Sequence, residues 1–348
     1  MINKLTLFIP DLLNAPLGLE AFAESEQPKL PALLRLLSRA EISRDANANY
    51  FSELMQRFCL SHSGEDIPAG SISHFIRTGE HDQQWRLRID PVYAQSDLNT
   101  IHLLAHEGVN LQQQEAVALV ETLNSHFEQD GWQIEIASTH AWYLSTHDKN
   151  SIATTPLHQA MSNDMSHCLP TGDDAGYWRS ALNEIQMLLH QHPVNQQRQQ
   201  SGRVPVNSVW FWGQGMLPES IEQNDSTVYT NDFIAAGLAG LAGAEVGTIE
   251  DFKNVLSDLN QHTQNDILLI DNRQLMRQHG FDINHWFELL VEMEQDWFVL
   301  ALNGVKAKSI KELVIQTGDG RRFIINKKRL GRWWRRDKNL SHWCEAKQ

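Results

Sequence analysis

Short apolar runs separated by helical or loop segments constrain the fold of this chain most strongly. The first run, residues 5–9, reads as a strand closed by Pro10, and residues 31–40 then carry leucines at helical spacing. Further short apolar runs lie at residues 208–212, 266–271, 298–302 and 313–317. Strands that alternate with helices favour a mostly parallel sheet covered by helices on its faces. The sequence therefore predicts an α/β fold.

The pattern changes between residues 85 and 148. Four strand-like runs surround one amphipathic helix at residues 112–127, and the following residues 150–174 are rich in Ser, Thr, Asn, Asp and Pro, as loops are. A chain of 348 residues is also long for a single core. We therefore expect a discontinuous core domain of residues 1–84 and 176–348, interrupted by a smaller α+β domain with its return linker at residues 85–175.

Charge and hydropathy limit the classes of partner. The formal net charge of −14 repels extended polyanions, which argues against nucleic acid and anionic membranes as general partners. The first ten residues lack the length and cleavage site of a signal peptide, and no later stretch has the apolar length of a membrane span. We expect a cytoplasmic protein.

The strand at residues 208–212 runs into Gly213-Gln214-Gly215, and loops at the carboxyl ends of strands are where α/β proteins bind ligands. Two glycines allow backbone N–H groups to approach a small phosphorylated or carboxylate ligand, although on the local pattern alone a tight turn after the strand is the favoured explanation. Upstream, amides and guanidinium groups on what reads as a loop suit the same anions, or else belong to a solvated loop. The candidate ligand-binding residues are Asn195, Arg198, Asn207, Trp210, Trp212, Gly213, Gln214 and Gly215.

Asp11 follows the first strand, where it is placed either to bind a metal or act in catalysis, or to cap the following turn. No histidines stand in metal-binding spacing, and no GxSxG motif marks a nucleophilic serine. Apart from Asp11 as a weak candidate, we assign no catalytic residue, and we assign no metal ligand.

A basic segment lies near the C-terminus. Residues 321–338 concentrate Lys and Arg around Trp333 and Trp334, which Arg335 and Arg336 follow. Basic residues interleaved with aromatic ones bind an acidic partner, acidic lipid or nucleic acid, or pack on the acidic surface of their own chain.

Several of these motifs together resemble a known family. The run from His192-Pro193-Val194-Asn195 through Arg198 and Asn207 to Trp210-Phe211-Trp212-Gly213 resembles the bacterial branch of the cofactor-independent phosphoglycerate mutases. Asp90-Pro91-Val92 and Trp333-Trp334-Arg335-Arg336 extend the similarity to the RpfE-type regulatory proteins, which are related to those mutases. The resemblance implies an alkaline-phosphatase-like α/β core with an inserted domain.

The resemblance also implies what the chain lacks. The mutases use two divalent metals and a serine that carries the phosphoryl group. Asp11 resembles their first metal-binding aspartate, but Leu12 follows it where the family has Gly, and Thr317-Gly318-Asp319 stands where the family has an Asp-His pair. This implies a non-catalytic relative that uses no cofactor. Such a protein would act in regulation and bind a ligand or partner. The alternative is a divergent mutase or phosphatase that depends on Mn²⁺ or Mg²⁺.

Overall fold

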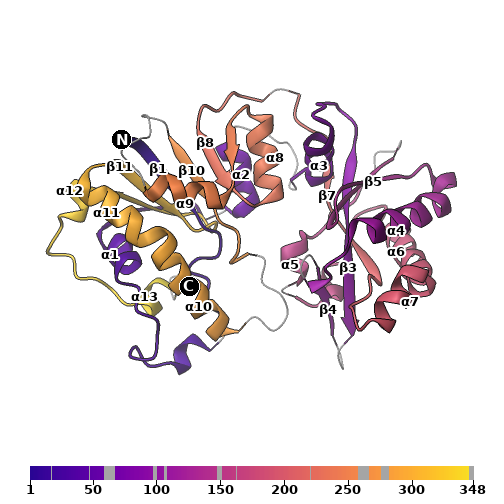
Figure 1. Ribbon diagram of the computed structural model, residues 1–348, viewed down its shortest axis with the longest axis horizontal. Coiled ribbons are helices and arrows are strands. Elements are labelled where there is room, and N and C mark those ends of the chain that lie inside the picture. The colour runs from indigo at the N-terminus through magenta and orange to yellow at the C-terminus, as the bar shows by residue number, and fades with distance from the viewer. Residues whose placement is uncertain are drawn as a thin grey trace. The chain divides into compact units, whose positions relative to one another are not determined.

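The computed structural model describes residues 1–16, 18–46, 48–58, 67–96, 100–105, 108–146, 151–161, 163–219, 221–257, 266–275 and 282–344. The chain forms two compact units (Figure 1). The first unit comprises Met1–Leu60, Ile221–Met276 and Gly280–Gln348. The second comprises Ser61–Ser220 and Arg277–His279.

A seven-stranded sheet forms the centre of the first unit, in the order β2-β12-β11-β1-β10-β8-β9. The pairs among β11, β1, β10, β8 and β9 are parallel, whereas β12 runs antiparallel to both β11 and β2. This mostly parallel arrangement confirms the predicted α/β class. The strands are β1 (Ile2–Phe8), β2 (Glu41–Arg44), β8 (Thr227–Thr230), β9 (Glu245–Gly247), β10 (Ile267–Ile270), β11 (Ile310–Gln316) and β12 (Arg321–Asn326).

Helices cover both faces of this sheet. Leu5 and Leu7 of β1 point into a core shared with the helices of one face, while Phe8 meets the ring of Tyr50 on the other at a centroid distance of 5.4 Å. The first face carries α1 (Pro31–Arg39), α9 (Ile249–Ser257), α10 (Ile283–Met293), α11 (Val299–Ala307) and α13 (Leu340–Cys344). The second carries α2 (Tyr50–Arg57) and α8 (Phe233–Leu241). Among the described helices, none combines the length and apolarity that a membrane span requires.

The strand predicted at residues 298–302 is wrong. These residues belong to a π-helical turn, Glu294–Phe298, and to α11 behind it. Trp297, Ala301 and Val305 recur every four residues and are fully buried, which is the spacing of one helical face. A short apolar run is ambiguous between a strand and a buried helix, and here the helix forms.

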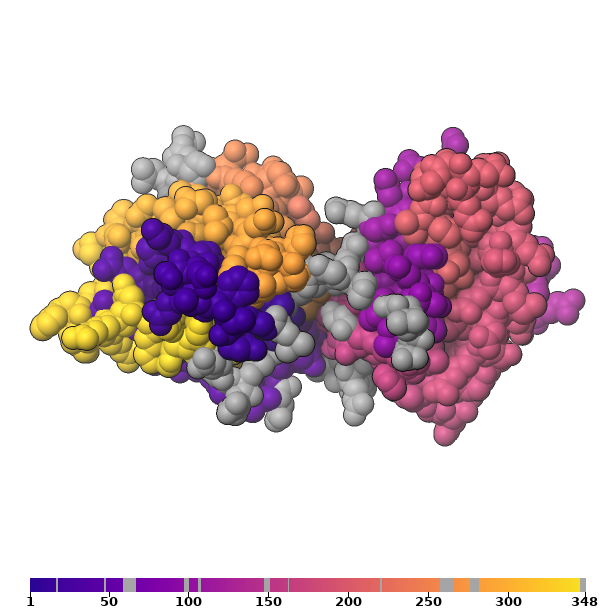
Figure 2. Space-filling model, turned by 90° about the horizontal axis from the view of Figure 1, so that it is seen from below, coloured from indigo at the N-terminus to yellow at the C-terminus, as the bar shows by residue number. Residues whose placement is uncertain are grey.

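The C-terminal residues pack beside the N-terminal part of the first unit, as Figure 2 shows in yellow and indigo. After β12 come α12 (Lys327–Leu330) and an irregular stretch that leads to α13. The ring of Trp343 packs edge-on against Phe323 at 5.6 Å, and the Arg321 guanidinium donates to the Trp343 carbonyl at 2.7 Å. These contacts fix α13 to the sheet.

The second unit is an antiparallel α+β structure. Its strands follow the order β4-β3-β6-β5, and β7 also pairs with β3. The strands are β3 (Arg86–Ser96), β4 (Ile101–Leu104), β5 (Gln133–Ser138), β6 (Ala141–Ser145) and β7 (Ser208–Gly215). The main helices are α3 (Ala69–Thr78), α4 (Gln113–His126), α6 (Ala175–Gln191) and α7 (Pro193–Gln200).

This unit extends beyond the predicted segment 85–175 at both ends. The reason is that β7 adds to β3, so the strand at residues 208–212 is antiparallel and lies outside the parallel sheet. Ser71 of α3 donates to the Gly215 carbonyl at 2.7 Å, which ties α3 to the same strand.

Candidate functional site

The carboxyl edge of the parallel sheet gathers polar residues from several strands of the first unit. The Asp271 N–H, just past β10, donates to the Phe8 carbonyl at 3.0 Å, and the Thr230 hydroxyl at the end of β8 donates to the Ile270 carbonyl at 3.0 Å. Next to β1, the Asp11 N–H donates to the Thr317 carbonyl at 2.9 Å. Ligands of open α/β sheets bind at this edge, so it is the candidate site.

Asp11 lies at this edge in an unusual backbone conformation. Its φ of 60° is in the left-handed region, which residues other than glycine enter at a cost of roughly 1 kcal/mol or more. Its carbonyl accepts from the Asn14 N–H at 3.0 Å, so the residue stands within a turn. The structure thus places Asp11 where the sequence predicts it, and its chemical role stays a prediction.

Two other carboxylates near this edge are paired with arginines of the chain. Asp271 is fully buried, forms an ion pair with Arg273 at 2.7 Å and accepts from the Trp297 indole N–H at 2.9 Å. Asp319 forms an ion pair with Arg321 at 2.6 Å. Burial alone would raise the pKa of Asp319, but the hydrogen bonds from Arg321 and Thr317 lower it below its ordinary value.

Helix α2 brings the phenol of Tyr50 to a fourth carboxylate, that of Asp232. Burial raises the pKa of Tyr50 well above 10.0, and the neighbouring Asp232 raises it further. Burial also raises the pKa of Asp232, whose carboxylate caps α8 by accepting from the Ala235 N–H at 2.6 Å and also accepts from Asn272. The sequence analysis missed this group.

The carboxylates of Asp271, Asp319 and Asp232 do not fit the pair of divalent metals that the resemblance implies. A metal ligand needs free carboxylate lone pairs, and here arginine, indole and backbone N–H groups occupy them. Within the part of the chain that the structure describes, no three His, Cys, Asp or Glu side chains converge as a metal site would require.

In the second unit, the glycines of the Gly213-Gln214-Gly215 run allow close packing of α3. Gly213 has φ of 63°, and a Cβ there would overlap the Cβ of Ala69. On the opposing side, a Cβ on Gly70 would stand 2.6 Å from the Leu87 nitrogen. The missing side chains let α3 lie directly on β3 and β7.

Two of the polar residues upstream of β7, Asn195 and Arg198, lie on helix α7 rather than on the predicted loop, whereas Asn207 follows that helix. Pro193 begins α7, and His192 caps it by accepting from the Val194 N–H at 3.2 Å. Asn195 is buried, and its side-chain amide donates hydrogen bonds to the carbonyls of Leu189 and Val206, both at 2.7 Å.

Arg198 is likewise buried and pairs with Glu115 at 2.6 Å, while Asn207 bridges to the backbone N–H of Ala94 at 2.7 Å. A ligand would have to compete with these internal contacts. Their predicted role in ligand binding stays a prediction.

The tryptophans of β7 connect two motifs that are far apart in the sequence. The Trp212 indole N–H donates to Asp90 at 2.7 Å, and Arg88 forms an ion pair with the same carboxylate at 2.7 Å. The Arg88 guanidinium also lies over the Trp212 ring, 5.3 Å from its centroid. Trp210 donates to the Thr155 carbonyl at 2.8 Å, and the Gln214 amide donates to the Ile152 carbonyl at 2.9 Å.

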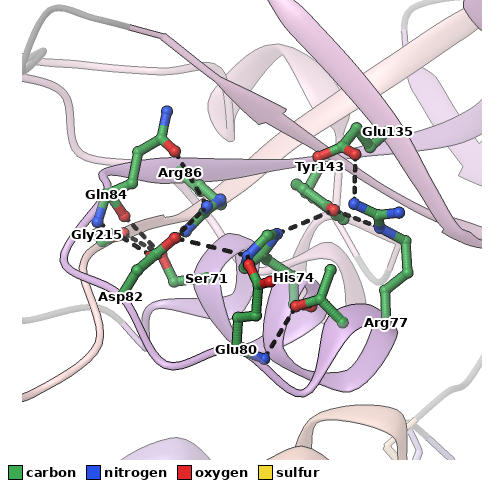
Figure 3. Close-up of polar contacts among 11 residues, drawn as sticks. Ser71, His74, Arg77, Glu80, Asp82, Gln84, Arg86, Glu135, Tyr143 and Gly215 are labelled. Atoms are coloured by element: carbon green, nitrogen blue, oxygen red, sulfur yellow. Dashed lines mark hydrogen bonds and ion pairs between the residues drawn. The ribbon is translucent and has the colours of Figure 1, made fainter.

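A chain of polar contacts runs along α3 (Figure 3). The Tyr143 oxygen accepts from Arg77 at 2.6 Å, which leaves the phenol proton for Nδ1 of His74, 3.2 Å away. On the other side of the imidazole, Nε2 stands 3.6 Å from Asp82. Burial and the nearby Arg86 lower the pKa of His74, and the hydrogen bond from Arg86 lowers the pKa of Asp82 to about 2. At neutral pH these contacts therefore hold a neutral His74 between the phenol of Tyr143 and the carboxylate of Asp82.

Comparisons with known proteins place this unit in a family context. The family model for 2,3-bisphosphoglycerate-independent phosphoglycerate mutase matches residues 79–195. This segment of the chain is similar to these mutases. The Methanosarcina barkeri mutase is 26% identical over 145 residues, which are 39% of this chain and 36% of that protein. The Methanothrix thermoacetophila mutase is 42% identical over 64 residues, which are 18% of this chain and 16% of that protein.

The similarity to the curated mutases is thus confined to about a third of their length or less. The matched residues 79–195 fall within the second unit, whereas Asp11 and the sheet edge belong to the first. Among solved structures, the PH0037 protein of Pyrococcus horikoshii superimposes with a TM-score of 0.54 at 11% identity, over 93% of this chain and 87% of that one. That likeness concerns the fold.

Proposed function

We propose that this mutase-like chain is a regulatory protein of the RpfE type that binds a ligand or partner and does not catalyse metal-dependent phosphoryl transfer. The observation that supports this is the pairing of Asp271 with Arg273 and of Asp319 with Arg321. A guanidinium occupies the carboxylate oxygens and adds a positive charge, so it opposes a cation in both ways.

The proposed small ligand carries a phosphate or a carboxylate. Within the predicted ligand segment, Asn195 and Arg198 are buried, while Gln214 and Gly215 are partly exposed at the end of β7. We therefore assign the initial contact with the ligand to Gln214 and the Gly215 backbone. Support for this assignment comes from the resemblance of the segment to the mutases.

An assay of phosphoglycerate interconversion tests the catalytic half of the proposal. Purified protein with 3-phosphoglycerate and either Mn²⁺ or Mg²⁺ is expected to form 2-phosphoglycerate no faster than a protein-free control. A metal-dependent rate that Asp11→Asn abolishes would overturn the proposal in favour of a divergent mutase. Release of inorganic phosphate with the same dependence would indicate a phosphatase.

Calorimetric titration tests the binding half separately. We expect 3-phosphoglycerate to bind without added metal, and Gln214→Ala to weaken that binding. Glu288→Ala, a change at an exposed position on α10 of the first unit, serves as the control. Absence of heat at millimolar ligand would contradict the binding half and leave the catalytic half standing.

A further inference from the structure

Two adjacent tryptophans are exposed in the irregular stretch between α12 and α13. Trp333 is 83% exposed and Trp334 is 64% exposed, and their rings meet edge to face at a centroid distance of 6.1 Å. We call Trp333 and Trp334, with Arg332, Arg335 and Arg336 around them, the tryptophan platform. Large aromatic side chains gain most from burial, so such a pair in solvent marks an interaction surface.

The backbone of the platform is fixed by the end of α1. The Arg39 guanidinium donates to the Arg332 carbonyl and pairs with Asp337 at 3.1 Å. Arg335 donates to the Ala40 carbonyl at 2.7 Å, and the Lys338 N–H donates to the Ser38 hydroxyl at 2.9 Å. A surface whose backbone is already ordered loses less conformational entropy on binding.

The platform is a basic island on an acidic protein. Residues 327–338 contain seven Lys and Arg and one Asp, whereas the whole chain has a net charge of −14. Arg329 pairs with Glu41, and Asp337 pairs with Arg35 and Arg39. Among the residues that the structure describes, Lys328, Arg332 and Arg336 form no ion pair with a carboxylate.

We infer that the tryptophan platform binds a short acidic segment of another protein. The indoles accommodate apolar side chains of that segment, and the unpaired guanidinium groups bind its carboxylates. Charges act over about 8 Å at physiological salt, so a short segment meets the basic island alone. A nucleic acid, an anionic membrane or a second copy of this chain would extend over the acidic remainder and be repelled.

Fluorescence anisotropy on the full chain tests this inference, which is independent of the mutase assay and the ligand titration. The probe is a fluorescein-labelled octapeptide of alternating glutamate and leucine. We expect binding that weakens about tenfold or more in the Trp333→Ala/Trp334→Ala variant and in Arg336→Glu. Two matched controls should bind the peptide as the parent does. Met187→Ala removes an exposed apolar side chain elsewhere, and Lys29→Glu reverses the charge of an exposed basic residue elsewhere.

Two results would overturn the inference outright. One is that the acidic peptide does not bind, and the other is that a peptide with lysine in place of glutamate binds equally well. Tighter binding of oligo-thymidylate or of phosphatidylserine vesicles, with the same dependence on Trp333 and Trp334, would assign the platform to nucleic acid or membrane. A dimer in sedimentation equilibrium that the double tryptophan variant dissolves would assign it to a second copy. Circular dichroism confirms that the variants remain folded.

Discussion

Asp90 is a carboxylate that is only 1% exposed and depends on two partners, Arg88 and Trp212. Burial raises the pKa of Asp90, so the ion pair is needed to keep the charged form. Because β3 and β7 each supply part of this group, it joins two motifs separated by more than a hundred residues. The shared occurrence of Asp90-Pro91-Val92 and Trp210-Phe211-Trp212 has a structural explanation here.

Replacing Asp90 by asparagine removes the charged partner of the Arg88–Asp90 ion pair, whose two side chains are both buried. We expect Asp90→Asn to lower the free energy of unfolding by about 3–5 kcal/mol. Trp212→Phe, which keeps the ion pair and removes one hydrogen bond, should cost about 1–3 kcal/mol. Urea denaturation measures both, and a loss below about 1 kcal/mol in Asp90→Asn would contradict the role of the pair.

His158 makes the stability of the second unit sensitive to acid. Burial lowers the pKa of His158 from 6.5 to about 4, so the unfolded chain takes up this proton first as the pH falls. The contribution of this residue is therefore complete above about pH 6.5 and is lost towards pH 4, at a cost of at most about 3 kcal/mol. We expect His158→Gln to flatten the fall in melting temperature between pH 7 and pH 4.

The matched control for that experiment is His190→Gln, which changes an exposed histidine on α6. The control should keep the parent's pH profile. An unchanged profile in His158→Gln would show that other groups cause the acid sensitivity.

Helix α3 depends on glycine at its contact with β3 and β7. In Gly70→Ala the new Cβ would meet the Leu87 backbone, which has little freedom to move. We expect this variant to lose about 1–3 kcal/mol of stability, and Gly213→Ala to lose more because its φ of 63° adds strain.

Gly176→Ala is the control, since a Cβ there has no atom within 4 Å and lies in a helix. It should gain about 0.5–1 kcal/mol. Thermal unfolding of the three variants provides the comparison, and equal effects at Gly70 and Gly176 would contradict the packing argument.

The same elements show what the sequence could and could not indicate. Alternation and helical spacing correctly located β1, β10, β11 and α4, because their apolar faces have a distinct period. The assignment failed at residues 298–302, because this short run is apolar throughout and the exposed Asn303 and Lys306 that reveal the helical period lie beyond it. The sequence also did not indicate which strands pair, since β7 pairs with β3 through contacts that no local pattern encodes.

At the candidate site, position was easier to predict than partnership. Asp11 was found from its place after an apolar run, and the same rule applied to Asp271, which follows the run Ile267–Ile270, would have found it as well. No local signal marked Tyr50, because α2 reaches the sheet edge only in the folded chain. The spacing of Asn195 and Arg198 also did not indicate that their side chains form hydrogen bonds and an ion pair within the protein.

Across the whole molecule, the two units have separate cores. In the second unit, Phe127 stacks on Trp132 at 4.3 Å, Trp132 on Trp178 at 5.3 Å, and Trp178 meets Phe211 at 5.1 Å. This aromatic cluster draws on α6, β7 and the residues around α4, all within Ser61–Ser220.

We expect a fragment of residues 61–220 to fold without the rest of the chain. It should give a near-ultraviolet circular dichroism signal from the aromatic cluster and a single cooperative thermal transition. A fragment with helical signal but no near-ultraviolet signal would show that its core needs the first unit.

The placement of β1 sets an order of events during synthesis. β1 leaves the ribosome well before its neighbours, because β10 and β11 begin only at Ile267 and Ile310. At about 5–20 residues per second, the apolar face of Leu5 and Leu7 waits on the order of ten seconds or longer for these strands. The Ser61–Ser220 part of the second unit is synthesised before either strand appears. The nascent chain therefore carries an unpaired central strand past a finished domain, and this interval is when chaperones would be needed most.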